Sequence, residues 1–418
     1  MAFRRILASV TVILVLTLSA FAGSNQIVVQ CTYGTDIKKV AAAYGGSILD
    51  YIPNTNTWLL SSSQSPGYLP QGVIYAETNL NVATSTGTGW ILSTKSAPDW
   101  YRLQPSFKLV RADAVSSIST GRGVVVADIN SLVDYSHPSL VGHLTAGYDF
   151  VLGRSTTVSL NQSSSSFLDQ SSSSFLDQSS SSFLDQSSSS FLDQSSANFL
   201  DQSSANFLDA SNPAHGHGTL VAGIIATIAP QAMIMPLRVF DDQGGADVFT
   251  ISKSIYWAVQ HGARVINMSF GTVDYSKTLQ NAIDYADHAN VVLVASAGNN
   301  NSSVRQYPAA FDKVLAIAAT NLSDKKAPFS NYGAHIFVDA PGVNIISSYP
   351  GGYYAMVSGT SFSAPIVAAE AALMISVGHD FPDSDLENGT VRIDALNPSY
   401  TDMLGKGRVN FVYAFNRD

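Results

Sequence analysis

Cysteine is almost absent from this sequence of 418 residues, since Cys31 is the only one. No disulfide can therefore form within the chain, and stability must come from packing or from bound ions. Charge is also scarce, because charged residues make up 13% of the chain and hydrophobic residues 45%. This composition provides a large apolar core and one or two domains, in which we expect Cys31 to be a small buried residue.

Basic clusters and long apolar runs are lacking as well, with one exception at the N-terminus. The net charge is −9, and lysine and arginine occur in nothing larger than short pairs, which argues against nucleic-acid binding. The exception is residues 1–22, where a basic start and an apolar run end in the cleavage signal Ala20-Phe21-Ala22. We expect a signal peptide and a secreted, extracellular protein without membrane contact after its removal; an uncleaved anchor is the alternative.

Residues 23–105 are predicted to form a small α+β domain and a connector. The apolar pattern predicts a strand at 26–33, a helix at 36–44 and strand structure at 47–60. From about 61 to 105 the sequence is rich in Ser, Gly, Pro and Thr, which is typical of a connector.

Residues 106–418 show the pattern of an α/β domain. The predicted strands are 124–129, 263–270, 291–298 and 313–320, and the predicted helices are 218–228, 247–261 and 278–288. Continuous Val/Ile/Leu strands separated by helices indicate a mostly parallel sheet covered on both faces.

A tandem repeat interrupts this domain at 162–209. The octapeptide QSSSSFLD occurs four times and QSSANFLD twice. Eight residues do not match the helical period, and the serines offer little to pack against. We expect a mobile surface loop, with an ordered or adhesive element as the alternative.

Three segments carry polar groups where catalytic chemistry needs them. The strand VVVADIN carries Asp128 and Asn130, His217 opens a helix, and Ser361 opens another. A serine beside the unpaired amides of a helix start suits a nucleophile whose product gains negative charge, although it is also a common helix cap. Asn299 follows the strand VVLVASAG, at a strand end where functional groups of such sheets collect.

Several motifs resemble those of the subtilisin-like serine proteases, the subtilases. HGTLVAG (217–223) resembles the histidine motif and GTSFSAP (359–365) the nucleophile motif, while VINMSFG, ASAGN and GKGRVN are also similar to family segments. The order acid, His, Ser along the chain fits subtilisin, and GTSFS lacks the second Gly of an esterase elbow. The resemblance covers roughly residues 110–418 and implies a three-layer α/β sandwich preceded by an α+β propeptide.

The resemblance also implies roles for individual residues. Ser361 would attack the scissile carbonyl, His217 would act as general base and then acid, and Asn299 would donate to the oxyanion. Two segments would bind an extended peptide substrate and line the pocket for the side chain before the cleaved bond: Ser269, Phe270 and Gly271, and Ser296, Ala297 and Gly298. Their small residues predict an open pocket for apolar side chains.

The motif departs from the family at position 130, where an ungapped alignment puts Asn130 in the place of the triad aspartate. An asparagine cannot stabilise the imidazolium and can select the wrong tautomer of the histidine, a loss of about four orders of magnitude in rate elsewhere. Three hypotheses stay open. Asp128, on the same strand face, reaches His217 through a bulge; Asn130 serves in a slow enzyme; or the domain is a non-catalytic relative.

The sequence thus predicts a secreted serine endopeptidase acting on proteins or peptides and inhibited by its own propeptide. The alternative is a pseudoprotease that acts as a peptide-binding or adhesive module. The chemistry requires no cofactor. Calcium is common in the family, but no Asp-x-Asp-x-Asp loop here assigns a metal site.

Overall fold

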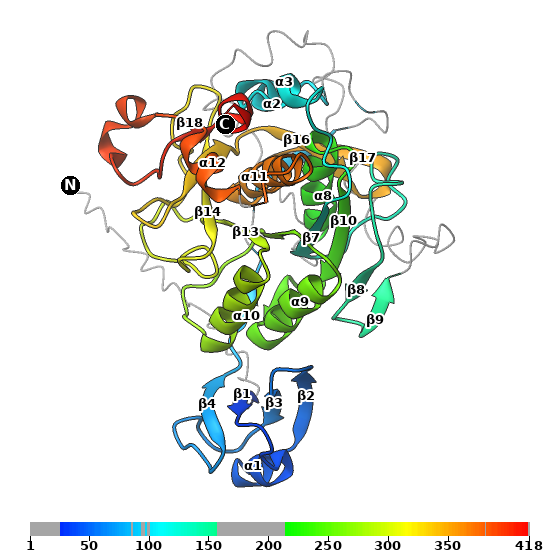
Figure 1. Ribbon diagram of the computed structural model, residues 1–418, viewed down its shortest axis with the longest axis vertical. Helices are drawn as coiled ribbons and strands as arrows, with labels where there is room; N and C mark the ends of the chain where they lie inside the picture. Colours follow the sequence, from blue (N-terminus) through cyan, green and yellow to red (C-terminus); the bar gives the residue numbers. More distant parts are fainter. Residues whose placement is uncertain are drawn as a thin grey trace, which may run out of the picture. The chain divides into compact units, whose positions relative to one another are not determined.

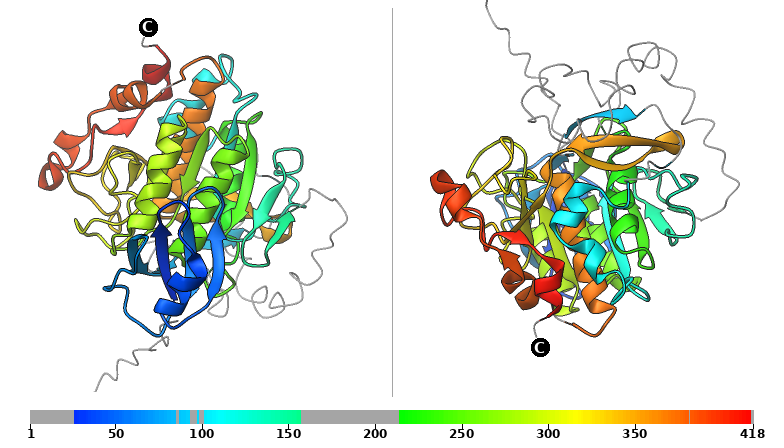
Figure 2. Two further views of the ribbon diagram at one scale, coloured as in Figure 1. Left: turned by 60° about the horizontal axis from the view of Figure 1, so that its bottom comes forward. Right: turned by 90° about the horizontal axis from the view of Figure 1, so that it is seen from above.

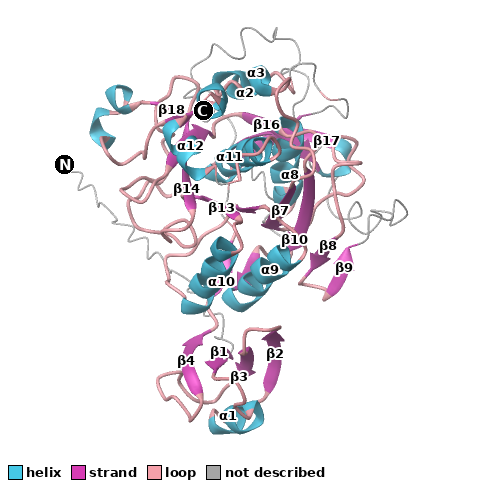
Figure 3. Cartoon of the chain, in the orientation of Figure 1, coloured by secondary structure: helices cyan, strands magenta, loops and turns pink. Residues whose placement is uncertain are grey.

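The computed structural model describes residues 26–84, 87–92, 97, 101–156, 214–380 and 382–416. The predicted signal peptide and the octapeptide repeat lie outside these residues. The chain divides into two compact units, Met1–Thr78 and Asn79–Asp418, and Figures 1 and 3 show their helices and strands. Among the described residues, no helix has the length and apolar character needed to cross a bilayer.

The first unit is a four-stranded antiparallel sheet with one helix. Its elements are β1 (Gln26–Cys31), α1 (Ile37–Ala43), β2 (Ile48–Ile52), β3 (Thr57–Ser61) and β4 (Val73–Thr78), in the sheet order β2-β3-β1-β4. Asp36 caps α1, because its side chain accepts a hydrogen bond from the Lys38 N–H. Cys31 is a free, buried thiol in the core of this unit, as the sequence predicted.

The second unit is built on a ten-stranded sheet. Its order is β18-β19-β15-β14-β13-β12-β7-β10-β8-β9, and the pairs from β19 to β8 are parallel. The strands are β7 (Val125–Asn130), β8 (Gly147–Asp149), β9 (Arg154–Thr156), β10 (Met233–Arg238), β12 (Val265–Met268), β13 (Val292–Ser296), β14 (Leu315–Thr320), β15 (Val338–Pro341), β18 (Thr390–Val391) and β19 (Arg408–Val409).

Helices cover both faces of this sheet, which gives a three-layer α/β sandwich (Figures 1 and 2). α8 (His217–Ile228) and α11 (Thr360–Ile375) pack together on one face, and α9 (Val248–Gln260) and α10 (Lys277–His288) pack together on the other. The shorter helices are α2 (Pro105–Leu109), α3 (Ala112–Val115), α12 (Asp383–Asn388) and α13 (Phe411–Phe415), with 3₁₀ turns at Pro350–Gly352, Asp394–Leu396 and Pro398–Tyr400. The predicted fold class is confirmed.

Two small sheets lie beside the main one. β5 (Asn81–Ala83) pairs with β11 (Gly245–Asp247), and β6 (Thr88–Leu92) joins the hairpin of β16 (Ile345–Tyr349) and β17 (Tyr353–Ser358). The prediction of a plain connector at 61–105 was therefore wrong, because this stretch also contains β4. These strands exist through pairing with distant partners, which a local pattern does not reveal.

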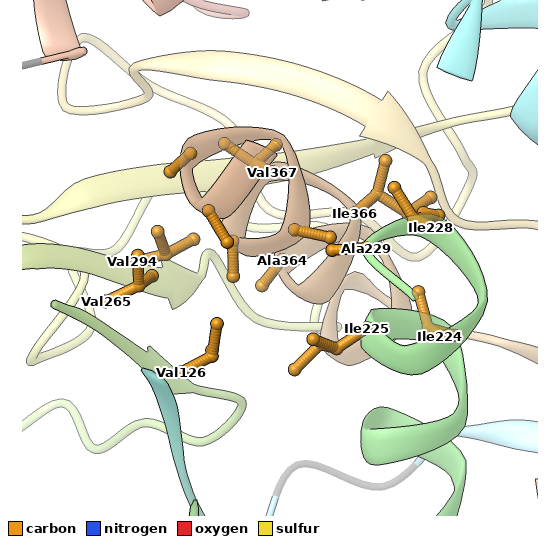
Figure 4. Packing of buried hydrophobic residues seen from close by; sticks show 14 of the residues in the cluster. Val126, Ile224, Ile225, Ile228, Ala229, Val265, Val294, Ala364, Ile366 and Val367 are labelled. Carbon is orange, nitrogen blue, oxygen red and sulfur yellow. The ribbon is translucent and has the colours of Figure 1, made fainter. Parts of the chain in front are cut away.

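The face of the sheet beneath α8 and α11 changes from apolar to polar along the strands. Val126 on β7 is paired in register with Val265 on β12, and two residues further on Asp128 is paired with Asn267. Figure 4 shows Val126, Val265 and Val294 packed towards the two helices. Because side chains alternate across a strand, Asp128 continues the same face as Val126 and brings polar groups towards the carboxyl ends of the strands.

Candidate active site

The predicted catalytic residues meet at the carboxyl ends of the parallel strands. Asn130 is the last residue of β7, and His217 is the first residue of α8. The ring of His217 lies 5.8 Å from that of Phe362, the neighbour of Ser361 in the first turn of α11. Strand ends and helix starts are therefore brought together as they are in other open α/β sheets.

His217 is held by Asn130. Its Nδ1 lies 2.7 Å from Asn130 Oδ1, while its Nε2 is buried and has no hydrogen-bond partner among the described residues. The hydroxyl of Ser131 fixes the start of α8, since it accepts from the Gly218 N–H at 3.0 Å and donates to the Ala214 carbonyl at 2.8 Å. Burial lowers the pKa of His217 to about 4, so the ring is neutral and able to accept a proton.

Asp128 does not take the place of the triad acid. β7 runs in unbroken register with β10 and β12, so the bulge that would move Asp128 towards His217 is absent. Its carboxylate instead accepts hydrogen bonds from Asn130 Nδ2 at 3.2 and 3.3 Å and from Asn267 Nδ2 at 3.0 Å. Desolvation raises the pKa of Asp128 to about 7, although the bonds from Asn267 and Asn130 lower it.

Ser361 is fixed by the backbone around it. Pro365 lies just past the first turn of α11, and it has no N–H for the Ser361 carbonyl. The Ser269 hydroxyl supplies the missing donor, at 3.0 Å from that carbonyl. Ser361 Oγ in turn donates to the Ser269 carbonyl at 3.4 Å, so the nucleophile lies next to the predicted substrate-binding segment.

Asn299 has the orientation that an oxyanion donor needs. Its Oδ1 accepts from the Thr360 N–H at 2.9 Å and from the Thr360 hydroxyl at 2.8 Å. The Nδ2 end of the amide therefore points away from Thr360, and a β-carbon added to Gly359 would lie 3.4 Å from it. A donor held in this way needs little reorganisation when an oxyanion forms.

The predicted substrate pocket is more polar than its small residues suggested. A β-carbon on Gly271 would lie 3.1 Å from Gln306 Oε1, and one on Gly298 would lie 2.3 Å from the same atom. Gln306 thus faces both pocket segments, and its Nε2 donates to Asn300 Oδ1 at 3.1 Å. This side chain comes from a loop outside the motifs, and it places a polar amide beside the pocket that the small residues predict to be open and apolar.

A segment of the chain itself lies along the predicted substrate-binding strand. β5 is antiparallel to β11, and Thr84 forms an antiparallel bridge with Phe270. The Thr84 N–H also donates to the Gly244 carbonyl at 3.0 Å. Residues 81–84 therefore run between β11 and the end of β12, as an added strand would.

Three contributors were missed at the sequence level. Asn267 binds Asp128, Thr360 orients Asn299, and Gln306 faces the pocket. Asn267 could have been identified from the sequence, since an amide within an apolar strand needs a hydrogen-bond partner. Among the described residues, no group of three or more His, Cys, Asp or Glu side chains could hold a metal ion, and calcium stays unassigned.

A serine and a histidine on adjoining helix starts, with an amide donor beside them, define the class of the protein as a serine hydrolase. A model of the subtilase family matches residues 121–405. Thermitase from Thermoactinomyces vulgaris is 30% identical over 313 residues, which covers 72% of this chain and 91% of thermitase. The chain belongs to the subtilase family, and the resemblance seen in its motifs is confirmed.

Two further comparisons agree. A thermophilic serine proteinase from Bacillus sp. (strain AK1) is 34% identical over 276 residues, 64% of this chain and 55% of that protein, so the chain spans about half of this relative. Fervidolysin from Fervidobacterium pennivorans, a keratinolytic enzyme related to subtilisin, superimposes with a TM-score of 0.69 at 22% identity. The match covers 94% of this chain and 61% of fervidolysin, and it supports the fold.

Proposed function

We propose that this chain is a secreted serine endopeptidase that cleaves peptide bonds through Ser361 and His217. The observation that carries the proposal is the 2.7 Å contact between His217 Nδ1 and Asn130 Oδ1. With the Nδ1 proton bound to an amide oxygen, Nε2 keeps its lone pair and can take the proton of Ser361 Oγ. The Oγ–carbonyl bond then forms, the C–N bond breaks, His217 protonates the leaving amine, and water releases the acyl group.

The neutral Asn130 makes this a slow enzyme by the standards of the family. Among the described residues, no carboxylate is hydrogen-bonded to His217, and burial lowers the pKa of the ring to about 4. A group with such a low pKa is a weak general base at neutral pH. The same feature favours the second candidate, a pseudoprotease that binds peptides along Ser269 to Gly271 without cleaving them.

Residues 23–105 act as the propeptide in this proposal. Support comes from residues 81–84, which form an added strand against β11 and Phe270 where a substrate would bind. A covalently attached strand in this position competes with substrate at a high effective concentration. We propose that it inhibits the enzyme until the chain is cleaved on the C-terminal side of Thr84.

The test is turnover of a broad peptide library by purified protein lacking residues 1–22, beside the Ser361→Ala variant. Cleavage that disappears in the variant supports a serine endopeptidase. In that case mass spectrometry should show that the precursor of the Ser361→Ala variant stays intact. Continued processing of pure Ser361→Ala protein would contradict self-cleavage. Equal background turnover in both proteins, with the propeptide removed, would instead support the pseudoprotease, and peptide binding by both would follow.

A further inference from the structure

Asp128 is a buried carboxylate without an obvious purpose. Its side chain is 0% exposed, and no ion pair involves it among the described residues. Two side-chain amides, Asn130 and Asn267, supply its hydrogen bonds. Burying a lone carboxylate is costly, so its presence two residues from the triad position calls for an explanation.

The chemistry of Asp128 determines which end of the Asn130 amide faces His217. An ionised carboxylate only accepts hydrogen bonds, so the end of Asn130 within 3.2 Å of it must be the NH₂ group. The Asn130 oxygen then points the other way, to His217 Nδ1 at 2.7 Å and to the Ser131 N–H at 2.8 Å. The orientation of the amide thus follows from the hydrogen-bonding character of its partners.

This orientation sets the tautomer of the catalytic histidine. An amide oxygen can only accept, so Nδ1 of His217 must carry the ring proton and Nε2 is left as the base. The opposite amide orientation would put the proton on Nε2 and remove the base, which is the damage expected when an asparagine replaces the triad acid. Asp128 therefore counteracts the defect that Asn130 would otherwise introduce.

We propose that Asp128 is a positioning residue that acts through Asn130, so that a carboxylate–amide–imidazole relay replaces the direct carboxylate–imidazole pair. The relay holds His217 in its reactive tautomer and keeps a negative charge on the far side of the amide when the imidazolium forms. Asn267 steadies the carboxylate with a second hydrogen bond at 3.0 Å. The catalytic part of the inference rests on the proposed endopeptidase activity.

A double-mutant cycle on the full chain tests the relay through activity. Asp128→Val should lower kcat about 10- to 100-fold at pH 8.5, less than a full loss of the acid, because the Ser131 N–H still holds the Asn130 oxygen. In an Asn130→Asp background the acid contacts His217 directly, so Asp128→Val should not lower kcat. A merely structural Asp128 would give the same loss in both backgrounds and would overturn the proposal.

The isosteric Asp128→Asn variant controls for misfolding, because it preserves the shape of the side chain. It keeps one acceptor for Asn130 and should give a smaller loss in kcat than Asp128→Val. The matched control is Asp339→Asn, which changes another fully buried aspartate of the same sheet and should leave kcat unchanged. An equal loss in the control would show that any buried aspartate has this effect, and the relay would be refuted.

A second readout separates this inference from the proposed function. The tautomer of His217 can be read from ring ¹⁵N shifts of histidine-labelled full chain carrying Ser361→Ala, with a His217→Gln spectrum for assignment. We expect the Nδ1–H form with Asp128 and a measurable Nε2–H population in Asp128→Val. That change, together with no peptidase activity in the chain that keeps Ser361, would support the relay and contradict the endopeptidase. An unchanged tautomer, with activity intact in both Asp128 variants, would contradict the relay and support the endopeptidase.

Discussion

The buried position of Asp128 should make the stability of this protein depend on pH. Desolvation raises the pKa of Asp128 from 3.8 to about 7 in the folded chain. Below pH 3.8 the carboxyl is protonated in both states and the folded protein is unpenalised. As the pH rises from 3.8 to 7 the unfolded chain releases the proton first, so the free energy of unfolding falls by about 1.4 kcal/mol per pH unit. The interval of 7 − 3.8 = 3.2 units corresponds to a total of about 4 kcal/mol.

Asp128→Asn removes this titration. The variant changes hydrogen bonding as well, so the sign of the stability difference at one pH decides nothing. The difference between variant and wild type should nevertheless shift by about 2 kcal/mol in favour of the variant between pH 5 and pH 7, because the wild-type penalty levels off near the folded-state pKa of about 7.

The assay is urea unfolding of the full chain at pH 5, 6, 7 and 8, with Ser361→Ala in every protein to prevent autolysis. Asp274→Asn, which removes an exposed carboxylate, controls for the loss of one negative charge. A variant-minus-wild-type difference that stays constant across this range would refute the reasoning, since it would mean that Asp128 has the same proton affinity in the folded and unfolded chains.

Three further predictions concern single side chains. Gln306→Ala should raise kcat/KM about 10-fold or more for substrates with a large apolar residue before the cleaved bond, relative to substrates with alanine there. Asn299→Ala should lower kcat by about 10² to 10³ with little change in KM, because the proposed contact of Asn299 with the oxyanion forms in the transition state. Glu370 is 0% exposed, and burial raises its pKa well above 4.5. In urea unfolding, the difference in the free energy of unfolding between Glu370→Gln and wild type should therefore shift in favour of the variant by about 1.4 kcal/mol for each pH unit from 4.5 up to the folded-state pKa.

The main sheet could be predicted from the sequence because its strands are buried on both faces. Apolar runs such as VVLVASAG are too short for a typical helix, so they indicate buried strands. β13 begins and ends within two residues of the predicted strand. The helix starts were also readable, since Asp247 caps α9 and Ser276 caps α10. Strands β5 and β6 could not be predicted, because they form only through pairing with β11 and β17.

The site was predictable where it depends on local geometry. The two-residue spacing of Asp128 and Asn130 implied that both side chains share one strand face, and they are hydrogen-bonded there at 3.2 Å. What could not be predicted is which of them reaches His217, because that depends on where β7 ends relative to the start of α8. Gln306 was invisible for a similar reason, as only the folded chain brings its loop to Gly271 and Gly298.

The position of the charge accounts for both the cost and the use of the relay. Asp128 lies within β7, between Pro236 on β10 and Asn267 on β12, so water does not screen its carboxylate. The same lack of screening strengthens the field that the carboxylate exerts across Asn130 on an imidazolium at His217. An acid within the sheet, at Asp128, thus lowers folding stability more than an acid at the strand end would. In return, its charge acts on His217 through the Asn130 amide. Asn130 is then better described as the middle member of a longer chain of hydrogen bonds than as a lost triad acid.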